Sequence, residues 1–277
     1  MPTSTTDKIR KLATTVCVTA LLAVTSCAAP DEPENQDSAS RLAQIKERGE
    51  LVACTTGDYP PFTVQENEED DFEGIDIEMV RDLAETMDVE LRIEKSSWGS
   101  LMDDFLQKCD IAVGGISMNP ERAEQVFFTE PILEDGKTPI TRCENVDKYK
   151  TIDDINQPSV TSIFLEGGTN EKFARANYPE GELVTHDNLT IFDQLVDKKA
   201  DVMTTDRAEA LYIAHEYDEL CVVHENETFD YSVMGYMLPQ SDMVFKEYVD
   251  QWLQIALNDG TYDEISKEWV GDIDLNG

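Results

Sequence analysis

The chain has 277 residues and carries 58 acidic against 22 basic side chains, which gives a formal net charge of −36 at pH 7. This charge argues against nucleic acid as a partner, because proteins that bind phosphate backbones draw their affinity from clustered Lys and Arg. Hydrophobic residues make up 40% of the chain, and only three histidines are present. The composition therefore predicts a globular protein with a buried core and no histidine-based metal site.

Residues 1–26 have the pattern of an export signal. Three basic residues near the start precede an apolar stretch at 12–24, which is typical of secretory signal peptides. The stretch Leu-Ala-Val-Thr-Ser-Cys at 22–27 resembles a bacterial lipobox, which implies cleavage before Cys27 and a lipid on its sulfur. An ordinary signal with an incidental cysteine is the alternative. Residues 27–40 are polar and contain prolines, so we expect a disordered tether.

The lipobox predicts the cellular location of the protein. We expect the protein to be exported and anchored by lipid to the outer face of the cell membrane or in the periplasm, with the lipid as its only membrane contact. The sequence leaves a homo-oligomer open.

Short apolar runs alternate with amphipathic stretches in the first half of the folded part. The spacing predicts strands at 51–55, 89–94 and 110–115 and helices at 75–87 and 101–108. The loop at 66–73 is rich in carboxylates. We expect this loop to be solvated, and a Ca²⁺ site is the alternative.

The same alternation continues to the C terminus. Strands are expected at 140–143, 160–165, 183–186 and 201–204, and helices at 152–155, 170–176, 191–196, 207–217, 245–257 and 262–269. Such alternation predicts α/β architecture with mainly parallel strands. We expect two lobes, one formed by 41–138 plus 237–277 and the other by 139–236, with a ligand cleft between them.

Four cysteines follow Cys27, and no metal-like spacing joins them. Cys54 and Cys109 lie in apolar, strand-like runs, so we expect buried thiols there. Cys143 and Cys221 lie at the ends of strand-like runs in polar surroundings, and we favour a disulfide between them.

Several segments resemble the type 3 solute-binding proteins that serve amino-acid transporters. They are Thr-Gly-Asp-Tyr-Pro-Pro-Phe at 56–62, Gly-Ile-Asp-Ile at 74–77 and Gly-Ile-Ser-Met-Asn-Pro-Glu-Arg at 115–122. The resemblance covers residues 41–277 and implies the two-lobed periplasmic-binding-protein type II fold.

Further strings resemble one branch of that family, the cyclohexadienyl dehydratases. They are Asp-Gly-Lys-Thr-Pro-Ile at 135–140, Gly-Gly-Thr-Asn-Glu-Lys-Phe-Ala-Arg at 167–175, Thr-Asp at 205–206, Leu-Cys at 220–221 and Tyr-Val-Asp-Gln-Trp-Leu at 248–253. The shared cysteines strengthen the bridge between Cys143 and Cys221. The lipobox is a departure, because that branch is usually described as periplasmic with a plain signal.

Arg122 and Ser117 are candidate binding residues for a carboxylate. A guanidinium can hold a carboxylate through two hydrogen bonds, with a hydroxyl and backbone N–H groups beside it. The resemblance implies that Arg122 clasps the ligand carboxylate, and a surface salt bridge with Glu121 or Glu124 is the alternative. Tyr59 and Trp98 fall where the family places aromatic walls, although either residue alone could belong to the core.

The string that starts at Gly167 supplies the remaining candidates. Two glycines and Thr169 before a helix let the backbone approach an anion at the helix N terminus. Glu171 in the first turn could be a helix-capping carboxylate, but the resemblance implies that it is the catalytic acid. Asn170 and Lys137 are further candidates for substrate binding. Asp206 matches an aspartate that commonly pairs with an α-ammonium group, and a helix N-cap is its alternative.

The resemblance implies a dehydratase that converts prephenate to phenylpyruvate, and arogenate to phenylalanine, without a metal or other cofactor. Loss of the ring hydroxyl as water requires a proton, which calls for a carboxylic acid kept protonated by burial. We therefore expect burial to raise the pKa of Glu171. Arg122, Lys137 and Lys172 would make the cleft locally positive. The alternative is a lipid-anchored amino-acid-binding protein of an ABC importer.

Overall fold

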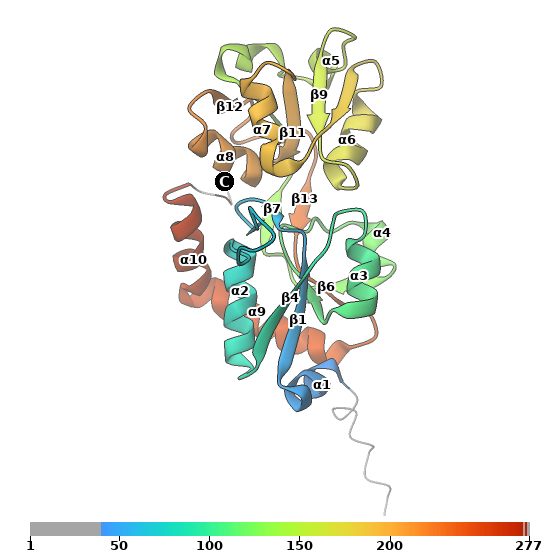
Figure 1. Ribbon diagram of the computed structural model, residues 1–277, viewed down its shortest axis with the longest axis vertical. Coiled ribbons are helices and arrows are strands. Elements are labelled where there is room, and N and C mark those ends of the chain that lie inside the picture. Colours follow the sequence, from blue (N-terminus) through green and yellow to red (C-terminus); the bar gives the residue numbers. More distant parts are fainter. Residues whose placement is uncertain (1–39, 274, 276–277) are drawn as a thin grey trace, which may run out of the picture. The chain divides into compact units, whose positions relative to one another are not determined.

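The computed structural model describes residues 40–273 and residue 275. The predicted signal peptide, the lipobox with Cys27, and positions 27–39 of the predicted tether lie outside the described residues. Within the described part, two five-stranded sheets form the centres of two lobes (Figure 1). No helix of this part combines the length and the apolar character that a membrane crossing requires.

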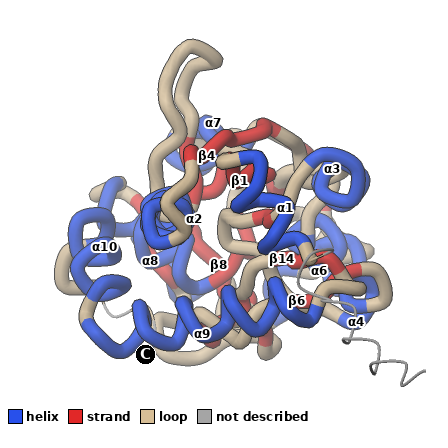
Figure 2. The backbone as a smooth tube through the Cα atoms, turned by 90° about the horizontal axis from the view of Figure 1, so that it is seen from below, coloured by secondary structure: helices blue, strands red, loops and turns tan. Residues whose placement is uncertain are grey.

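The first lobe is built on a sheet with the strand order β4-β1-β5-β14-β6. Its strands are β1 (Glu50–Thr55), β4 (Glu90–Lys95), β5 (Ile111–Ala112), β6 (Val126–Phe128) and β14 (Met237–Pro239). Its helices are α1 (Arg41–Arg48), α2 (Ile75–Thr86), α3 (Leu101–Lys108), α4 (Pro120–Ala123), α9 (Met243–Asp259) and α10 (Thr261–Val270). Figure 2 shows α2, α3, α9 and α10 around the strands of this lobe. A short hairpin, β2 (Asp58–Tyr59) and β3 (Thr63–Val64), follows β1.

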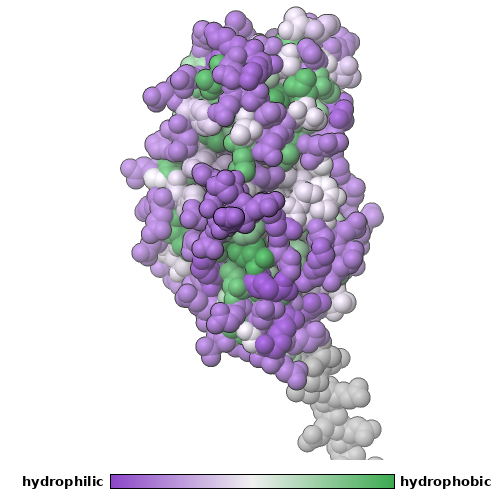
Figure 3. All heavy atoms as spheres, viewed as in Figure 1, coloured by the Kyte–Doolittle hydropathy of each residue, from purple (hydrophilic) through white to green (hydrophobic). Residues whose placement is uncertain are grey.

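The second lobe has a sheet with the strand order β10-β9-β11-β8-β12. Its strands are β8 (Lys137–Arg142), β9 (Thr161–Phe164), β10 (Glu182–Thr185), β11 (Val202–Asp206) and β12 (Leu220–Val222). Its helices are α5 (Ile152–Ile155), α6 (Thr169–Asn177), α7 (Asn188–Val196), α8 (Arg207–Glu216) and the 3₁₀ helix η2 (Cys143–Lys148). Each lobe has its own core of buried apolar side chains, whereas hydrophilic residues cover most of the face in Figure 3.

Helix α2 shows how local sequence fixes an element of the first lobe. Its residues Ile75, Ile77 and Leu83 are fully buried in the core. The helix begins after Gly74, whose φ is +130°, and a Cβ added there would lie 2.3 Å from the carbonyl oxygen of Phe62. Only glycine fits this close approach, so α2 packs directly against the loop that follows Tyr59.

The chain passes between the lobes twice, through two paired strands. β7 (Leu133–Asp135) and β13 (Ser232–Met234) form an antiparallel pair and lie between the two sheets in Figure 1. β8 follows β7 and enters the second sheet, and β14 follows β13 and returns to the first sheet. These crossings place the ends of both sheets beside each other.

The expected predominance of parallel strands is wrong for half of the strand pairings in these two sheets. β4, β1 and β5 run parallel, as do β10, β9 and β11. β14 pairs antiparallel with β5 and β6, and β8 pairs antiparallel with β11 and β12. The reason is that β8 and β14 each follow a crossing, so they start at the end of the sheet where the parallel strands finish.

The structure contains two disulfides. One joins Cys143 to Cys221, the pair favoured from the sequence. The other joins Cys54 to Cys109, so the expectation of two buried thiols is wrong. Cys54 lies on β1, and Cys109 precedes β5, the strand that pairs with β1. This pairing brings the two sulfurs together although 55 positions separate them.

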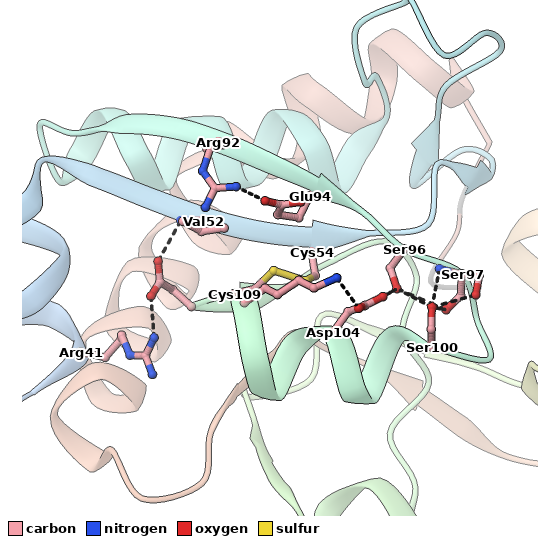
Figure 4. The surroundings of a disulfide bond; sticks show 12 residues. Arg41, Val52, Cys54, Arg92, Glu94, Ser96, Ser97, Ser100, Asp104 and Cys109 are labelled. Atoms are coloured by element: carbon pink, nitrogen blue, oxygen red, sulfur yellow. Dashed lines mark hydrogen bonds and ion pairs between the residues drawn. A yellow bond between two sulfur atoms is a disulfide. The ribbon is translucent and has the colours of Figure 1, made fainter.

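Figure 4 shows the surroundings of the Cys54–Cys109 bridge. Asp110, the residue after Cys109, fixes the chain at this point. Its carboxylate accepts hydrogen bonds from the backbone N–H of Val52, at 2.8 Å, and from Nη1 of Arg41, at 2.9 Å. The end of α3 is therefore bound to β1 by both a covalent and a polar connection.

Candidate ligand site between the lobes

A small cavity lies where the carboxyl ends of strands from both lobes meet. Its volume is about 10 Å³, which is room for about one water molecule. The residues that line it are Tyr59, Trp98 and Gly115 from the first lobe and Leu165, Gly168, Thr169, Asn170 and Asp206 from the second. Five of the predicted substrate-binding residues therefore meet here.

Two aromatic side chains form the wall on the first lobe. Tyr59 is 4% exposed, and its ring packs edge-to-face against Trp98 with centroids 5.3 Å apart. The indole Nε1 of Trp98 donates to Oδ1 of Asp58 at 3.1 Å. Gly115 has a φ of +66°, and an added Cβ would lie 2.8 Å from Cδ1 of Tyr59. The absence of a side chain at Gly115 therefore lets the tyrosine ring approach the backbone that follows β5.

The first turn of α6 forms the opposite wall. Gly167 has a φ of +94°, a conformation that side chains rarely adopt. It turns the chain so that Thr169 and Asn170 begin the helix beside the cavity. The Asn170 Nδ2 donates to Oγ1 of Thr205 at 2.8 Å, so the orientation of this amide is fixed by β11.

Lys137 lies behind this wall and is only 3% exposed. It begins β8 directly opposite Asp206 at the end of β11. Its Nζ donates to Oδ1 of Asp206 at 2.8 Å, to Oγ1 of Thr169 at 3.0 Å and to Oδ1 of Asn170 at 2.5 Å. These three bonds use every N–H of the ammonium group.

Asp206 also connects the two lobes. Its Oδ2 accepts a hydrogen bond of 2.5 Å from the hydroxyl of Tyr59. Burial raises the pKa of Tyr59 well above its usual value, and the nearby carboxylates of Asp206 and Glu209 raise it further. Tyr59 is therefore a neutral donor at any physiological pH. Asp206 also occupies the N-cap position of α8, but its side chain makes no capping hydrogen bond there and instead bonds to Lys137 and Tyr59.

Arg122 lies in α4, next to a second cavity of about 180 Å³ that is also lined by Trp98, Gly167 and Lys172. Its Nη1 donates to the backbone carbonyl of Ser117 at 2.7 Å. Burial lowers the pKa of Arg122, because removal from water disfavours its charge.

The alternative role for Arg122, a surface salt bridge, does not occur among the described residues. Glu121 instead pairs with Lys172 of the second lobe, at 2.5 Å between Oε2 and Nζ. Ser117 contacts Arg122 through its backbone carbonyl oxygen, and Ser117 is 6% exposed. The guanidinium is therefore held in place by backbone while its charge lies close to the ligand site.

Glu171 lies in the first turn of α6, outside the set of residues that line the 10 Å³ cavity. Its Oε2 accepts from the N–H of Gly167 at 2.6 Å, and its Oε1 accepts from Nε of Arg175 at 2.7 Å. The Gly167 hydrogen bond lowers the pKa of Glu171, and Arg175 lowers it further. The expectation of a raised pKa is therefore wrong for this arrangement, because two donors stabilise the charged form.

Sequence analysis did not identify Glu209, a fully buried carboxyl on α8. Its Oε1 accepts from Nδ2 of Asn188 at 2.8 Å, and its Oε2 accepts from the hydroxyl of Thr205. Burial raises the pKa of Glu209 to about 8, and Asp206 raises it whereas Lys137 opposes the rise. A glutamate inside the alanine-rich stretch Ala208-Glu-Ala210 was the only signal, and it could not reveal these partners.

Asn188 also connects the two lobes. Its Nδ2 also donates to the backbone carbonyl of Asp58 in the first lobe, at 2.8 Å. No cluster of three or more His, Cys, Asp or Glu side chains is placed to hold a metal ion in residues 40–273 or at 275. The site is therefore built from aromatic rings, amides, hydroxyls and paired charges.

Two lobes that enclose a small polar and aromatic site define a class of binding protein. The chain belongs to the bacterial extracellular solute-binding proteins, family 3, whose model matches residues 51–272. It is 46% identical to the cyclohexadienyl dehydratase of Pseudomonas aeruginosa, over 85% of this chain and 88% of that relative. It is 26% identical to the L-cystine-binding protein TcyJ of Escherichia coli, over 83% and 86% of the two chains.

Solved structures similar to this chain also include both binding proteins and dehydratases. An ancestral amino-acid-binding protein, described as a precursor of cyclohexadienyl dehydratase, has a TM-score of 0.76 and 30% identity. That match covers 83% of this chain and all of the other. An ancestral cyclohexadienyl dehydratase has 39% identity and a TM-score of 0.53, over 83% of this chain and 96% of the other. The periplasmic-binding-protein type II fold is thus common to binding proteins and dehydratases.

Proposed function

We propose that the protein is a cyclohexadienyl dehydratase, a carbon-oxygen lyase. It converts prephenate to phenylpyruvate, and arogenate to phenylalanine, by removing the ring hydroxyl as water and the ring carboxylate as CO₂. The observation that carries this proposal is the 46% identity to a cyclohexadienyl dehydratase over 85% of the chain, which includes both lobes. Formation of the aromatic ring supplies the driving force.

The described site offers groups suited to binding such a substrate. Arg122 carries a positive charge next to the 180 Å³ cavity and binds one substrate carboxylate. The N-terminal turn of α6, with Thr169 and Asn170, is favourable for a second anionic group. Tyr59 and Trp98 flank the ring and exclude water. The lobes must first separate, because a cavity of about 10 Å³ cannot hold the substrate.

Glu171 is our proposed general acid. It protonates the leaving hydroxyl, so it must carry a proton when the substrate is bound. Its partners Gly167 and Arg175 hold it ionised in this arrangement. The two carboxylates of a bound substrate act in the opposite direction, because nearby negative charge raises the pKa of a carboxyl. Lobe closure over the substrate strengthens this effect by excluding water.

We also propose that Cys27 carries the lipid that anchors the protein. The support is the lipobox at 22–27 and the membership of an extracellular protein family. Residues between Cys27 and α1 then form the tether that separates the lobes from the membrane.

A spectroscopic assay with prephenate tests the enzymatic proposal. Purified protein should produce phenylpyruvate, followed by its absorbance, well above the uncatalysed acid reaction at neutral pH. The second candidate, amino-acid delivery to an ABC importer, is favoured by the similarity to the ancestral amino-acid-binding protein. Tight calorimetric binding of an amino acid without any turnover of prephenate would replace the dehydratase by this candidate.

A further inference from the structure

An ammonium group of the protein, that of Lys137, lies directly behind the wall of the cavity. Lys137 and Asp206 form an ion pair in which the two side chains are 4% and 2% exposed. The three hydrogen-bond acceptors around Nζ are Asp206, Thr169 and Asn170, and all three line the cavity. This is the set of partners that a primary ammonium group on a ligand would need.

These acceptors already have partners within the protein. Oδ1 of Asp206 bonds to Lys137, and Oδ2 bonds to the hydroxyl of Tyr59. Oδ1 of Asn170 is occupied by Lys137 as well, and its Nδ2 is a donor. Each of these oxygens keeps a second lone pair, but the charge of Asp206 is already balanced by Lys137. An ammonium on the ligand would therefore share this carboxylate with Lys137 and gain less attraction to offset its removal from water.

The charge of Lys137 also disfavours an ammonium group on the ligand. A second ammonium placed beside the acceptors of Lys137 would meet a like charge in a site of low solvent exposure. A carbonyl oxygen meets no such penalty. Thr169 accepts its hydrogen bond from Lys137 through Oγ1, so its own hydroxyl hydrogen can be donated to a ligand oxygen.

We infer that Lys137 is a specificity-determining residue that makes the site prefer a 2-oxo acid over the corresponding 2-amino acid. Within the proposed function, on which the substrate names rest, prephenate is the preferred substrate over arogenate. Lys137 supplies the ammonium that an amino acid would bring, so the ligand side chain that fits is the one without it.

Binding of the two reaction products tests this inference without any need for turnover. Phenylpyruvate and L-phenylalanine differ only in the oxo and amino groups at the position in question. Calorimetry on the full protein should show that phenylpyruvate binds at least about 10-fold tighter. The Lys137→Met variant should lose this preference or reverse it. The control is Lys246→Met, which removes another partly buried lysine that pairs with Asp250 on α9, and it should keep the wild-type preference.

The Lys137→Met variant leaves the charge of Asp206 buried without its oppositely charged partner, which is destabilising. A thermal-shift measurement uses this defect: L-phenylalanine should raise the Tm of Lys137→Met more than phenylpyruvate does, because its ammonium replaces the lost one. The double variant Lys137→Met/Asp206→Asn carries neither charge and should bind both ligands with similar affinity. It provides the binding test if the single variant does not fold.

Equal binding of both products by the wild type, or an unchanged preference in the double variant, would overturn the role of Lys137. Kinetics then separate the inference from the proposed function. Comparable kcat/KM values for prephenate and arogenate contradict the inference and leave the dehydratase standing. A clear preference for phenylpyruvate without turnover of either substrate supports the inference and contradicts the dehydratase.

Discussion

Glu171 and Arg175 lie one helical turn apart on α6, with 2.7 Å between their charged atoms. The charge of Arg175 therefore influences the pKa of Glu171. A general acid works only while it holds a proton, so the rate should fall as the pH rises through the pKa of Glu171. With Glu171 in its proposed role, the ion pair with Arg175 is expected to limit activity at neutral pH, because Arg175 lowers the pKa of Glu171.

Replacement of Glu171 tests its chemical role. Glu171→Gln keeps the shape of the side chain but cannot deliver a proton, so kcat on prephenate should fall by about 10²- to 10⁴-fold while KM changes little. Steady-state kinetics with the acid reaction subtracted provide the measurement, and Glu180→Gln, an exposed change in the same lobe, serves as the control. Wild-type kcat in Glu171→Gln would exclude Glu171 as the acid.

Arg175→Met should change the pH profile. Arg175 lowers the pKa of Glu171, so its removal raises that pKa and increases the protonated fraction at neutral pH. The decline of kcat/KM with rising pH should move to higher pH in the variant. Profiles of wild type and variant that coincide between pH 5 and 9 would show that this ion pair does not govern the acid.

The raised pKa of Glu209 predicts that the stability of the folded protein depends on pH. Its pKa is about 8 in the folded protein against 4.5 for a free side chain. The protonated form is therefore favoured by folding, and this stabilisation is complete below pH 4.5 and is lost as the pH rises through 8. At about 1.4 kcal/mol per pKa unit, the loss amounts to at most about 5 kcal/mol.

Glu209→Gln should remove this loss, because glutamine stays neutral. Urea unfolding at pH 5 and pH 9 should show a smaller decrease in the free energy of unfolding for the variant than for the wild type. Glu216→Gln changes an exposed side chain at the end of the same helix and should follow the wild type. Equal decreases in wild type and Glu209→Gln would contradict the assignment.

At the scale of elements, the sequence predicts the chain order of helices and strands well, because apolar periodicity reports burial. It does not predict which strands are neighbours. Cys54 and Cys109 each looked like buried thiols, and only the pairing of β1 with β5 shows that they meet. Similarly, Lys137 is paired with Asp206 through the register of β8 on β11, which no local pattern in the sequence contains.

The two disulfides should differ in their reactivity. Cys54 and Cys109 are 0% and 4% exposed, whereas Cys143 and Cys221 are both partly exposed. A mild reductant should therefore open the Cys143–Cys221 bridge in the folded protein and leave the other intact until unfolding. Alkylation of the released thiols followed by peptide mass analysis measures this order, and simultaneous labelling of all four cysteines below the unfolding transition would contradict it.

Loss of the Cys143–Cys221 bridge should also lower stability. The bridged residues are 78 positions apart, and closing a loop of that length contributes about 4 kcal/mol in the chain-entropy treatment. A double Cys→Ser variant should show a loss of up to this size in chemical unfolding. Its dehydratase activity should remain, since the bridge joins η2 to β12 at the opposite end of β8 from Lys137.

For the whole molecule, the proposed anchor and the proposed site lie in separate parts of the chain. Cys27→Ser should release the protein from membranes, and the soluble protein should keep the wild-type kcat/KM because the site residues all lie between 58 and 209. Membrane fractionation with an activity assay on both fractions is the measurement. Cys17→Ser changes another cysteine of the leader and should leave the protein membrane-bound; a Cys27→Ser protein that still carries lipid would disprove the anchor.

The position of β14 has a consequence for how the protein matures after export. β14 is placed between β5 and β6, yet it is made more than a hundred residues later than either. A chain that emerges from a translocation pore in order from its N terminus can complete the second sheet, whose last strand ends at Val222, while the first sheet still lacks a central member. Until β14 is added, β5 and β6 of the first lobe have unpaired edges. We therefore expect the first lobe to be the part of the nascent protein most exposed to proteases and to self-association.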